Sequence, residues 1–310
     1  MKPLPSSPFN LTTLFSLPGL PADRDGDGLP ETIGAIIVLA EGAELPEHLA
    51  AVDLAARLGF ESLALEAPLA RVDSPPGAPS TDQFREDDEA RVPVFIGRPG
   101  TLSSGCPEPL ARLLAVCKPG EGIVALSTAP RPAVLVGGND AAGLRAAMLA
   151  LVTDALDRAE RLDDGAAGVE ALRISESGGP DLPPAEERTA PPLRSLAQLF
   201  GPDGLAVDED GDLLPDRSRT RLVFPSDLSP AEARAAVDLA ARIGLETLGL
   251  ALPLAAGSED YLAADDELPI VVAPLEYARN QAASVGVGLS PTAVGQALPP
   301  DRSRGDQGTP

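Results

Sequence analysis

The sequence predicts an α/β protein made of two tandem repeats of a small layered domain, with helices packed on a mixed sheet and the second repeat incomplete. Two pairs of stretches carry this prediction. Residues 23–31 read DRDGDGLPE and residues 208–216 read DEDGDLLPD. Residues 51–70 read AVDLAARLGFESLALEAPLA and residues 236–255 read AVDLAARIGLETLGLALPLA. Both pairs are 185 positions apart. Because the match is ungapped, it indicates a duplicated structural unit.

The repeat divides the 310 residues into five regions, each within the ordinary size of a domain or a linker. In chain order these are an N-terminal lead-in (1–22), a first α/β repeat (23–158), an acidic Pro- and Gly-rich linker (159–195), a second, truncated repeat (196–278) and a disordered tail (279–310). The tail is polar and rich in small residues, which cannot bury a core. We expect a truncated or frame-shifted gene end, because nothing after Val272 resembles the end of the first repeat.

Hydrophobic patterns place the elements of each repeat. The expected strands are 33–39, 62–65, 93–97, 122–126 and 133–137 in the first repeat, and 220–224, 247–250 and 269–272 in the second. A helix follows the first strand of each repeat, and Ser229 with Glu232 forms the expected capping box of the second. Gly59 and Gly244 stand where a helix ends in a left-handed residue. Further helices are expected over 109–117 and from Asn139 onward. Helices interspersed with strands predict a layered α/β domain.

Composition limits the classes of partner. The formal net charge of −23 argues against nucleic acid and anionic membranes, because a phosphate surface demands a basic protein. We therefore expect an unidentified protein or glycan partner. No stretch approaches the about 20 apolar residues of a membrane span, so no span is expected.

Location and redox state follow from the N-terminus and the cysteines. The first 20 residues are interrupted by four prolines and lack the apolar run of a signal peptide. The location is expected to be extracellular or periplasmic if the true start lies upstream, and otherwise cytoplasmic. Cys106 and Cys117 are expected to be free thiols, because two cysteines make no disulfide framework.

The first repeat resembles the small non-catalytic α/β domain that precedes the catalytic barrel in chitobiases and beta-hexosaminidases. Three stretches carry the resemblance: AIIVLAEGAELPEHLAAVDLAARLG from Ala35, VPVFIGR from Val92, and PAVLVGGNDAAGLRAAMLALVTDAL from Pro132. The last joins a strand, a Gly-Gly turn, an Asn-Asp cap and a helix. The resemblance covers about residues 33–157 and, without its ending, about residues 218–273. It implies an accessory role next to a catalytic domain.

The acidic turn before each repeat lies outside that pattern. Tandem units of this kind are similar to the N-terminal accessory regions of large bacterial secreted proteins such as zinc carboxypeptidases. That similarity implies location and accessory role alone. Zinc carboxypeptidase chemistry requires two histidine ligands, and the chain has a single histidine, His48. The chain therefore lacks that site.

The first acidic turn is a candidate calcium site. Asp23, Asp25, Asp27 and Glu31 occupy positions 1, 3, 5 and 9 of a calcium loop, and Gly28 occupies position 6. Oxygen ligands at alternate residues wrap one hard cation, and a glycine at position 6 permits the sharp turn. The twelfth position, which supplies a bidentate carboxylate in an EF-hand, is glycine here. The alternative is an acidic, solvated turn that leads into a strand.

The second acidic turn repeats the carboxylates in a weaker form. Leu213 replaces the glycine and Arg219 the twelfth ligand. The corresponding candidate metal ligands are Asp208, Asp210, Asp212 and Asp216.

The other chemically suggestive residues have structural explanations. The Gly137-Gly138-Asn139-Asp140 stretch is expected to be a tight turn with a helix cap, because an Asp at the cap repels an anion. His48 is expected to face solvent or cap its helix. Asp53 and Asp238, four residues before Arg57 and Arg242, are expected to form surface ion pairs.

These observations favour a non-catalytic accessory or interaction module, which can form the N-terminal part of a larger bacterial hydrolase. No catalytic and no cofactor-binding residues are predicted, and calcium is the one candidate cofactor. Two alternatives stay open: a calcium-stabilised extracellular binding module, and a fragment of a zinc carboxypeptidase-like or carbohydrate-active enzyme that lacks its catalytic domain.

Overall fold

The computed structural model describes residues 9–17, 19–73, 90–162, 168–175, 204–208, 212, 216–261, 268–274 and 277. Residues 1–272 form one compact body, and every helix and strand named below belongs to it. The elements of residues 21–175 are called the first unit and those of residues 206–271 the second unit.

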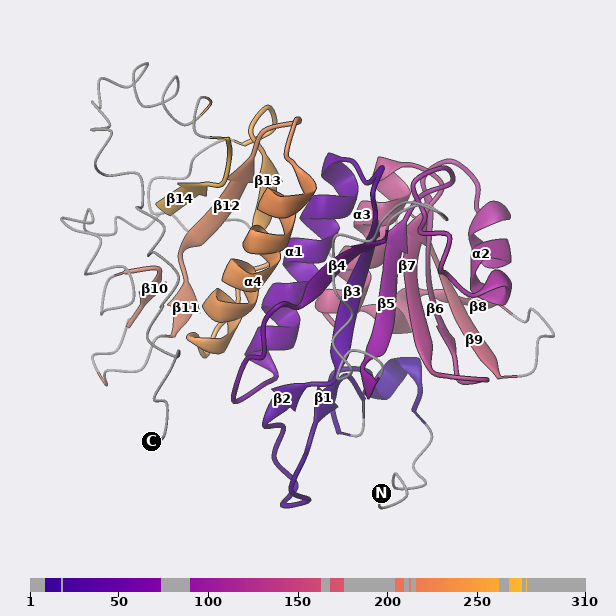
Figure 1. The fold of residues 1–310 in the computed structure, drawn as a ribbon, viewed down its shortest axis with the longest axis horizontal. Helices are drawn as coiled ribbons and strands as arrows, with labels where there is room; N and C mark the ends of the chain where they lie inside the picture. The colour runs from indigo at the N-terminus through magenta and orange to yellow at the C-terminus, as the bar shows by residue number, and fades with distance from the viewer. Residues whose placement is uncertain are drawn as a thin grey trace, which may run out of the picture. The chain divides into compact units, whose positions relative to one another are not determined.

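A seven-stranded mixed sheet forms the frame of the first unit (Figure 1). Its order is β4-β3-β5-β7-β6-β9-β8. The strands are β3 (Ala35–Ala40), β4 (Ala70–Asp73), β5 (Val92–Gly97), β6 (Glu121–Ser127), β7 (Ala133–Gly138), β8 (Glu160–Leu162) and β9 (Val169–Ser175). Strands β4, β3, β5 and β7 are parallel, and β6, β9 and β8 continue the sheet with antiparallel pairs. The predicted mixed sheet is thereby confirmed.

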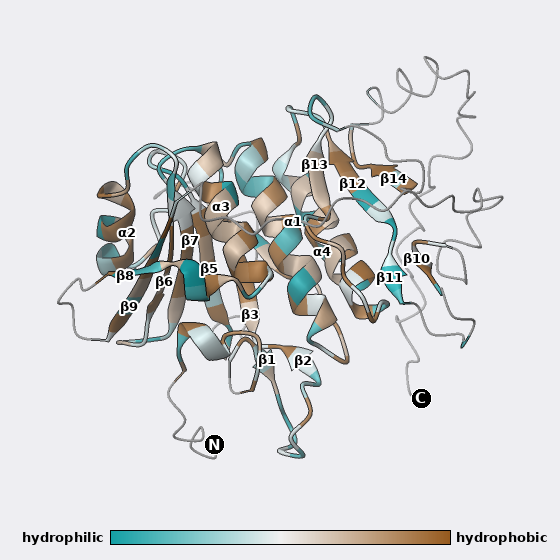
Figure 2. Cartoon of the chain, turned by 180° about the vertical axis from the view of Figure 1, so that it is seen from behind, coloured by the Kyte–Doolittle hydropathy of each residue, from teal (hydrophilic) through white to brown (hydrophobic). Residues whose placement is uncertain are grey.

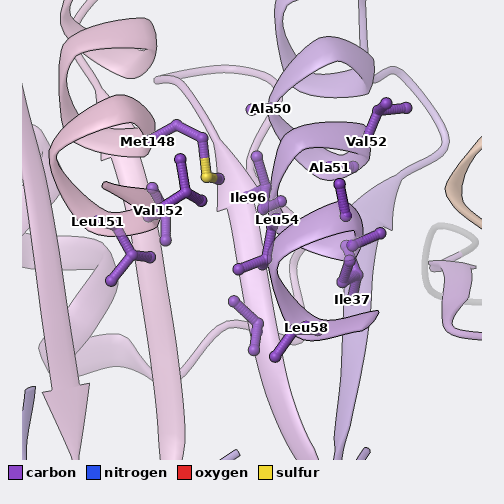
Figure 3. Close-up of a cluster of buried hydrophobic side chains, with 14 of the residues drawn as sticks. Ile37, Ala50, Ala51, Val52, Leu54, Leu58, Ile96, Met148, Leu151 and Val152 are labelled. Atoms are coloured by element: carbon purple, nitrogen blue, oxygen red, sulfur yellow. The ribbon is translucent and has the colours of Figure 1, made fainter. Parts of the chain in front are cut away.

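Helices cover both faces of this sheet. Alternate residues of a strand point to opposite faces; Ile37 of β3 packs with α1 (Leu45–Phe60) and α3 (Ala141–Val152), whereas Ile36 packs with α2 (Glu108–Ala115). Figure 3 shows the first of these cores, where side chains of α1 and α3 meet those of β3 and β5. The alanines of α1, which are fully buried, allow the helix to lie close to the sheet.

The second unit is a smaller arrangement of strands and one helix. Its strands β12 (Thr220–Phe224), β13 (Ala255–Gly257) and β14 (Leu268–Val271) form a parallel sheet of order β13-β12-β14, and α4 (Pro230–Leu245) follows β12. Thr220 pairs with Leu268 as Ala35 pairs with Val92. The first residues of these pairs are 185 positions apart, as in the sequence repeat, and the second are 176 apart, as are the expected strands that begin at 93 and 269.

A small antiparallel pair precedes each unit's sheet. Strand β1 (Pro21–Ala22) pairs with β2 (Thr32–Ile33), and β10 (Ala206–Val207) pairs with β11 (Arg217–Ser218). Each acidic segment therefore joins two antiparallel strands. A short 3-10 helix, Leu11–Thr13, comes before β1, and Leu14 and Phe15 beside it are buried against the first core. Phe200, which follows Phe15 by the same 185 positions, lies outside the described residues.

Helices α1 and α4 lie side by side and join the two units into one body (Figures 1 and 2). The contact is close and reciprocal. A Cβ added to Gly59 would lie 2.0 Å from the carbonyl oxygen of Ala241, and one added to Gly244 would lie 2.0 Å from that of Ala56. Both glycines lie within their helices, and neither is in the left-handed region. Their predicted capping role is wrong; they are glycines because the backbone of the other helix occupies the space of a Cβ.

Two further predictions about elements need correction. The expected strands 62–65 and 247–250 are turns, because the Ser62 and Thr247 hydroxyls bond to backbone two residues ahead. The second strands of the units, β4 and β13, begin after Pro68 and Pro253 instead. In the predicted linker, β8 and β9 belong to the first sheet, and β9 lies between β6 and β8. By contrast, the predicted helix over 109–117 and the Ser229–Glu232 capping box are confirmed.

Replacing Gly244 by alanine tests the helix contact. The added methyl group meets backbone of α1, which cannot rotate away, so α1 and α4 must separate. We expect a loss of about 1–3 kcal/mol in the free energy of unfolding, as overpacking typically costs. Urea denaturation of Gly244→Ala measures it. The control is Gly42→Ala, whose Cβ meets nothing within 4 Å; equal losses in the two variants would contradict the prediction.

Candidate metal site

The first acidic turn is the loop between β1 and β2. Gly26 and Gly28 adopt φ of 83° and 92°, a region that side chains with a Cβ rarely enter. The prediction of a sharp turn at Gly28 is therefore confirmed. Arg24 forms an ion pair with Glu66, which ties the turn to the segment between α1 and β4.

Backbone amides of the turn hold its carboxylates in place. Asp23 accepts hydrogen bonds from Gly26 N (2.5 Å) and Gly28 N (2.9 Å). Asp25 accepts from Asp27 N at 3.1 Å, and Asp27 accepts from Leu29 N at 2.8 Å. Glu31 accepts from Arg24 N at 2.6 Å across the loop. All four side chains are therefore fixed by their own loop.

Four carboxylates converge as a result. One oxygen from each of Asp23, Asp25, Asp27 and Glu31 lies within 4.8 Å of the others. Calcium binds oxygen ligands at about 2.3–2.6 Å, so two ligands on opposite sides of one ion are about 5 Å apart. The spacing fits one such ion. Asp25 and Asp27 are exposed and Asp23 and Glu31 half-buried, which leaves access for water ligands.

The twelfth loop position contributes no ligand. Gly34 has no side chain, its amide donates to Leu20 O at 2.7 Å, and its carbonyl accepts from Val92 N at 2.8 Å. The geometry therefore supports a loop with four carboxylates and not an EF-hand.

The second acidic turn is described in part. Asp208, Asp212 and Asp216 are described, whereas Asp210 lies outside the described residues. Among the residues that the structure describes, these three do not join a group of converging metal ligands. The Asp216 amide donates to Val207 O at 2.8 Å, as the hairpin geometry requires.

The other nucleophilic and titratable candidates serve the core. His48 is 4% exposed, so the prediction of a solvent-facing side chain is wrong; burial lowers its pKa, which keeps it neutral. Cys106 and Cys117 are free thiols, as predicted, and burial raises the pKa of Cys106 to about 12. A thiol with so high a pKa is a poor nucleophile.

Asp140 caps α3 by accepting from Gly143 N at 2.8 Å, as predicted, and backbone hydrogen bonds lower its pKa.

Asp53 and Asp238 do not form the predicted surface ion pairs. Asp53 of α1 accepts from Leu254 N (2.6 Å) and Ala255 N (3.0 Å) at the start of β13. Asp238 of α4 accepts from Leu69 N at 2.9 Å, just before β4. Each carboxylate thus bonds to the backbone of the other unit. No local pattern could show this, because the partners lie 201 and 169 residues away.

The arginines predicted to pair with them have other partners. Arg57 pairs with Glu61 and Asp154, each at 2.7 Å, and lies over the rings of Phe15 and Phe60. It thereby links α1 to the end of α3 and to the N-terminal segment. Arg242 pairs with Glu246.

An ion-pair network around the buried Glu47, at the carboxyl ends of β3 and β5, was not predicted. The Glu47 side chain, which is 0% exposed, accepts from Arg98 Nε at 2.6 Å and from Thr101 Oγ1 at 2.5 Å. Arg98 also pairs with Glu44 at 2.6 Å. The network fixes the loop after β5 to the first turn of α1. A glutamate in a first helical turn is commonly a cap, so no local pattern indicated that Glu47 is buried.

Comparison with known proteins adds no family. No protein-family model and no curated protein sequence matches the chain. The resemblance to the chitobiase accessory domain stays a prediction. Of the helices in the described part of the chain, none combines the length and apolar character needed to cross a membrane.

Removing the Glu47 charge tests the network. Glu47→Gln leaves Arg98 partly buried without its main counter-ion, and breaking a buried pair typically costs about 3–5 kcal/mol. We expect a loss of that order in the free energy of unfolding, measured by urea denaturation at pH 7. The exposed pair of Glu108 and Arg112 (2.8 Å) supplies the control: Glu108→Gln should cost less than about 1 kcal/mol. Similar losses in both variants would contradict the prediction that the pair of Glu47 and Arg98 stabilises the fold more than the exposed pair does.

Proposed function

We propose that the chain is a calcium-stabilised, non-catalytic binding module built from two copies of one α/β unit. The observation that carries the calcium part is the convergence of four carboxylate oxygens within 4.8 Å in a turn fixed by its own amides. Without a cation, four negative charges at this spacing repel one another. A bound divalent ion removes that repulsion and stabilises the folded loop.

Two further observations support the module as a whole. The matching strand registers and the reciprocal glycines of α1 and α4 favour a duplicated unit. The buried ionisable side chains bond to backbone or to one another: Asp53 bonds to β13, Asp238 to the segment before β4, and Glu47 to Arg98. These contacts give the buried ionisable groups a structural role. That is what we expect of a binding or accessory module without catalytic residues.

Calcium titration of the full chain tests the cation. Sites in extracellular modules bind calcium with dissociation constants of about 0.1–1 mM. At 10 mM calcium, such affinities add about 1.4–2.7 kcal/mol, which raises the melting temperature by about 3–8 °C. Magnesium should give a smaller shift, because it demands a tighter, octahedral site.

Matched variants locate the effect. Asp25→Asn keeps the size of the side chain and an acceptor for Asp27 N, but removes one charge; the calcium shift should fall by more than half. Asp227→Asn changes an exposed acid outside the turn and should keep the full shift. An equal shift in both variants, or none in the unmodified chain, would disprove calcium binding here.

The non-catalytic part has a separate test. The purified chain should show no hydrolysis of chromogenic glycosides or of peptide substrates above a buffer blank. Hydrolysis that is lost when one carboxylate is replaced by its amide would overturn this part and leave the calcium result unaffected.

A further inference from the structure

We propose that one side of α4 is the contact surface for a second copy of this chain, in a two-fold symmetric dimer whose α4 helices lie side by side and antiparallel. The surface consists of Glu232, Ala235, Leu239 and Arg242, here called the α4 stripe. Residues three and four positions apart are neighbours on a helix, so these four share one side of it. The contact is independent of the proposed function, because the acidic turn between β1 and β2 contributes no residue to it.

The corresponding stripe of α1 is covered in the first unit. It consists of the residues 185 positions earlier, which are Glu47, Ala50, Leu54 and Arg57. Ala50 is 4% exposed and Leu54 0%, and Arg57 Nη1 donates to Val152 O of α3 at 3.3 Å. Figure 3 shows Leu54 on the side of α1 that faces α3. In the first unit this side of the helix is therefore packed against another helix.

On α4 the same side is open. Ala235 and Arg242 are exposed, and Leu239 is half-buried. In the part of the chain that the structure describes, α4 is the one helix of the second unit, so this unit has no counterpart of α3 there. The α4 stripe thus presents an alanine and a leucine at a surface where the first unit has a helix contact.

The strand next to β12 shows the same difference. Ile270 of β14 and Val272 just after it pack against the same core cluster as α4, and both are half-buried. Val94 and Ile96 of β5, which lie 176 positions earlier, are 0% exposed. The open surface therefore extends from the α4 stripe onto apolar side chains of the sheet that α4 covers.

The order of residues along the α4 stripe identifies a second copy as the partner. Glu232 and Arg242 stand five positions on either side of Val237, and Ala235 and Leu239 stand two positions on either side. In a two-fold pair, residue i of one copy contacts residue j of the other, and j contacts i. Antiparallel helices that cross at Val237 therefore place each glutamate opposite an arginine, and each alanine opposite a leucine. Facing charges of opposite sign fix the register of such a contact.

Both charged groups can accept a second partner. Glu232 accepts from Ser229 N at 2.8 Å through Oε2, and an ionised carboxylate has about four lone-pair sites. Arg242 pairs with Glu246, yet its side chain remains 53% exposed, and a guanidinium has five N–H donors. The formal net charge of −23 repels a second copy at long range. At about 0.15 M salt that repulsion is screened beyond about 8 Å, whereas the direct contacts of the α4 stripe persist.

Sedimentation equilibrium of the full chain tests the dimer. At a chain concentration of about 100 μM and about 0.15 M salt, the mass should approach twice the 31.7 kDa of one chain. Ala235→Glu places a charge opposite Leu239 of the second copy and should give the mass of a single chain. Its circular dichroism should match that of the unmodified chain, because Ala235 is exposed. A single-chain mass for the unmodified chain would overturn the proposal and assign the α4 stripe to a different protein.

Exchange of the charges tests the register. Glu232→Arg brings arginines face to face and Arg242→Glu brings glutamates face to face, so each variant alone should dissociate with a constant about tenfold higher or more. An equal mixture of the two variants should restore the dimer, because every facing pair is then of opposite charge. This recovery also shows that both variants are folded.

The control for the exchange is Arg112→Glu, which changes an exposed arginine of α2 that pairs with Glu108 and should leave the dimer unchanged. Dimers of unchanged affinity in both single variants of the α4 stripe would overturn the proposal. A mixture that stays as dissociated as its two components would also overturn it.

Discussion

The structure depends on the close approach of α1 and α4. Gly59 and Gly244 have no side chain at the points where these helices touch. The backbone carbonyl groups of Ala241 and Ala56 lie where their Cβ atoms would be. Each helix also packs on its own sheet, so α1 and α4 form a double layer between the first and second units. A three-stranded parallel sheet with one helix buries little apolar surface by itself. The second unit therefore requires α1 as part of its core.

This approach explains why two carboxylates lie in an apolar interface. Strands β4 and β13 are edge strands of their sheets, and the amides at their starts have no neighbouring strand to bond. Asp238 supplies an acceptor for Leu69 N, and Asp53 supplies one for Leu254 and Ala255 N. An unsatisfied buried amide costs about 1–3 kcal/mol. The two carboxyl groups therefore accept hydrogen bonds from the edge-strand amides that the helix contact buries. In doing so they lose their own hydration, which is unfavourable.

Local sequence signals predicted most of the fold and little of the interface. The strand periodicities, the capping box at Ser229 and the matching offsets of 185 and 176 sufficed for α1 and α4 and for the strands β3, β5, β6, β7, β12 and β14. The two turns at Ser62 and Thr247 were missed because each contains apolar residues at strand-like spacing. Asp53 and Gly59 were misjudged, and the burial of Glu47 was missed, for a different reason. A buried and an exposed aspartate at one helical position look the same in sequence, since burial is decided by a partner about 200 residues away. The acidic turn could be predicted because all its ligands are local.

The two ionic features of the molecule act on different parts of it. The carboxylates of the acidic turn are exposed or half-buried in a hairpin loop between β1 and β2, and their mutual repulsion is relieved by a cation without any change in the core. Asp53 is enclosed between the units, and its carboxyl group accepts hydrogen bonds from the Leu254 and Ala255 amides. Replacing one group leaves the contacts of the other intact, and energies at such independent sites usually add. Calcium should therefore stabilise the acidic turn, whereas the hydrogen bonds of Asp53 join the two units with or without the ion. The acidic turn can thus take up a divalent ion at the surface while the buried carboxyl groups of Asp53 and Glu47 keep their structural contacts.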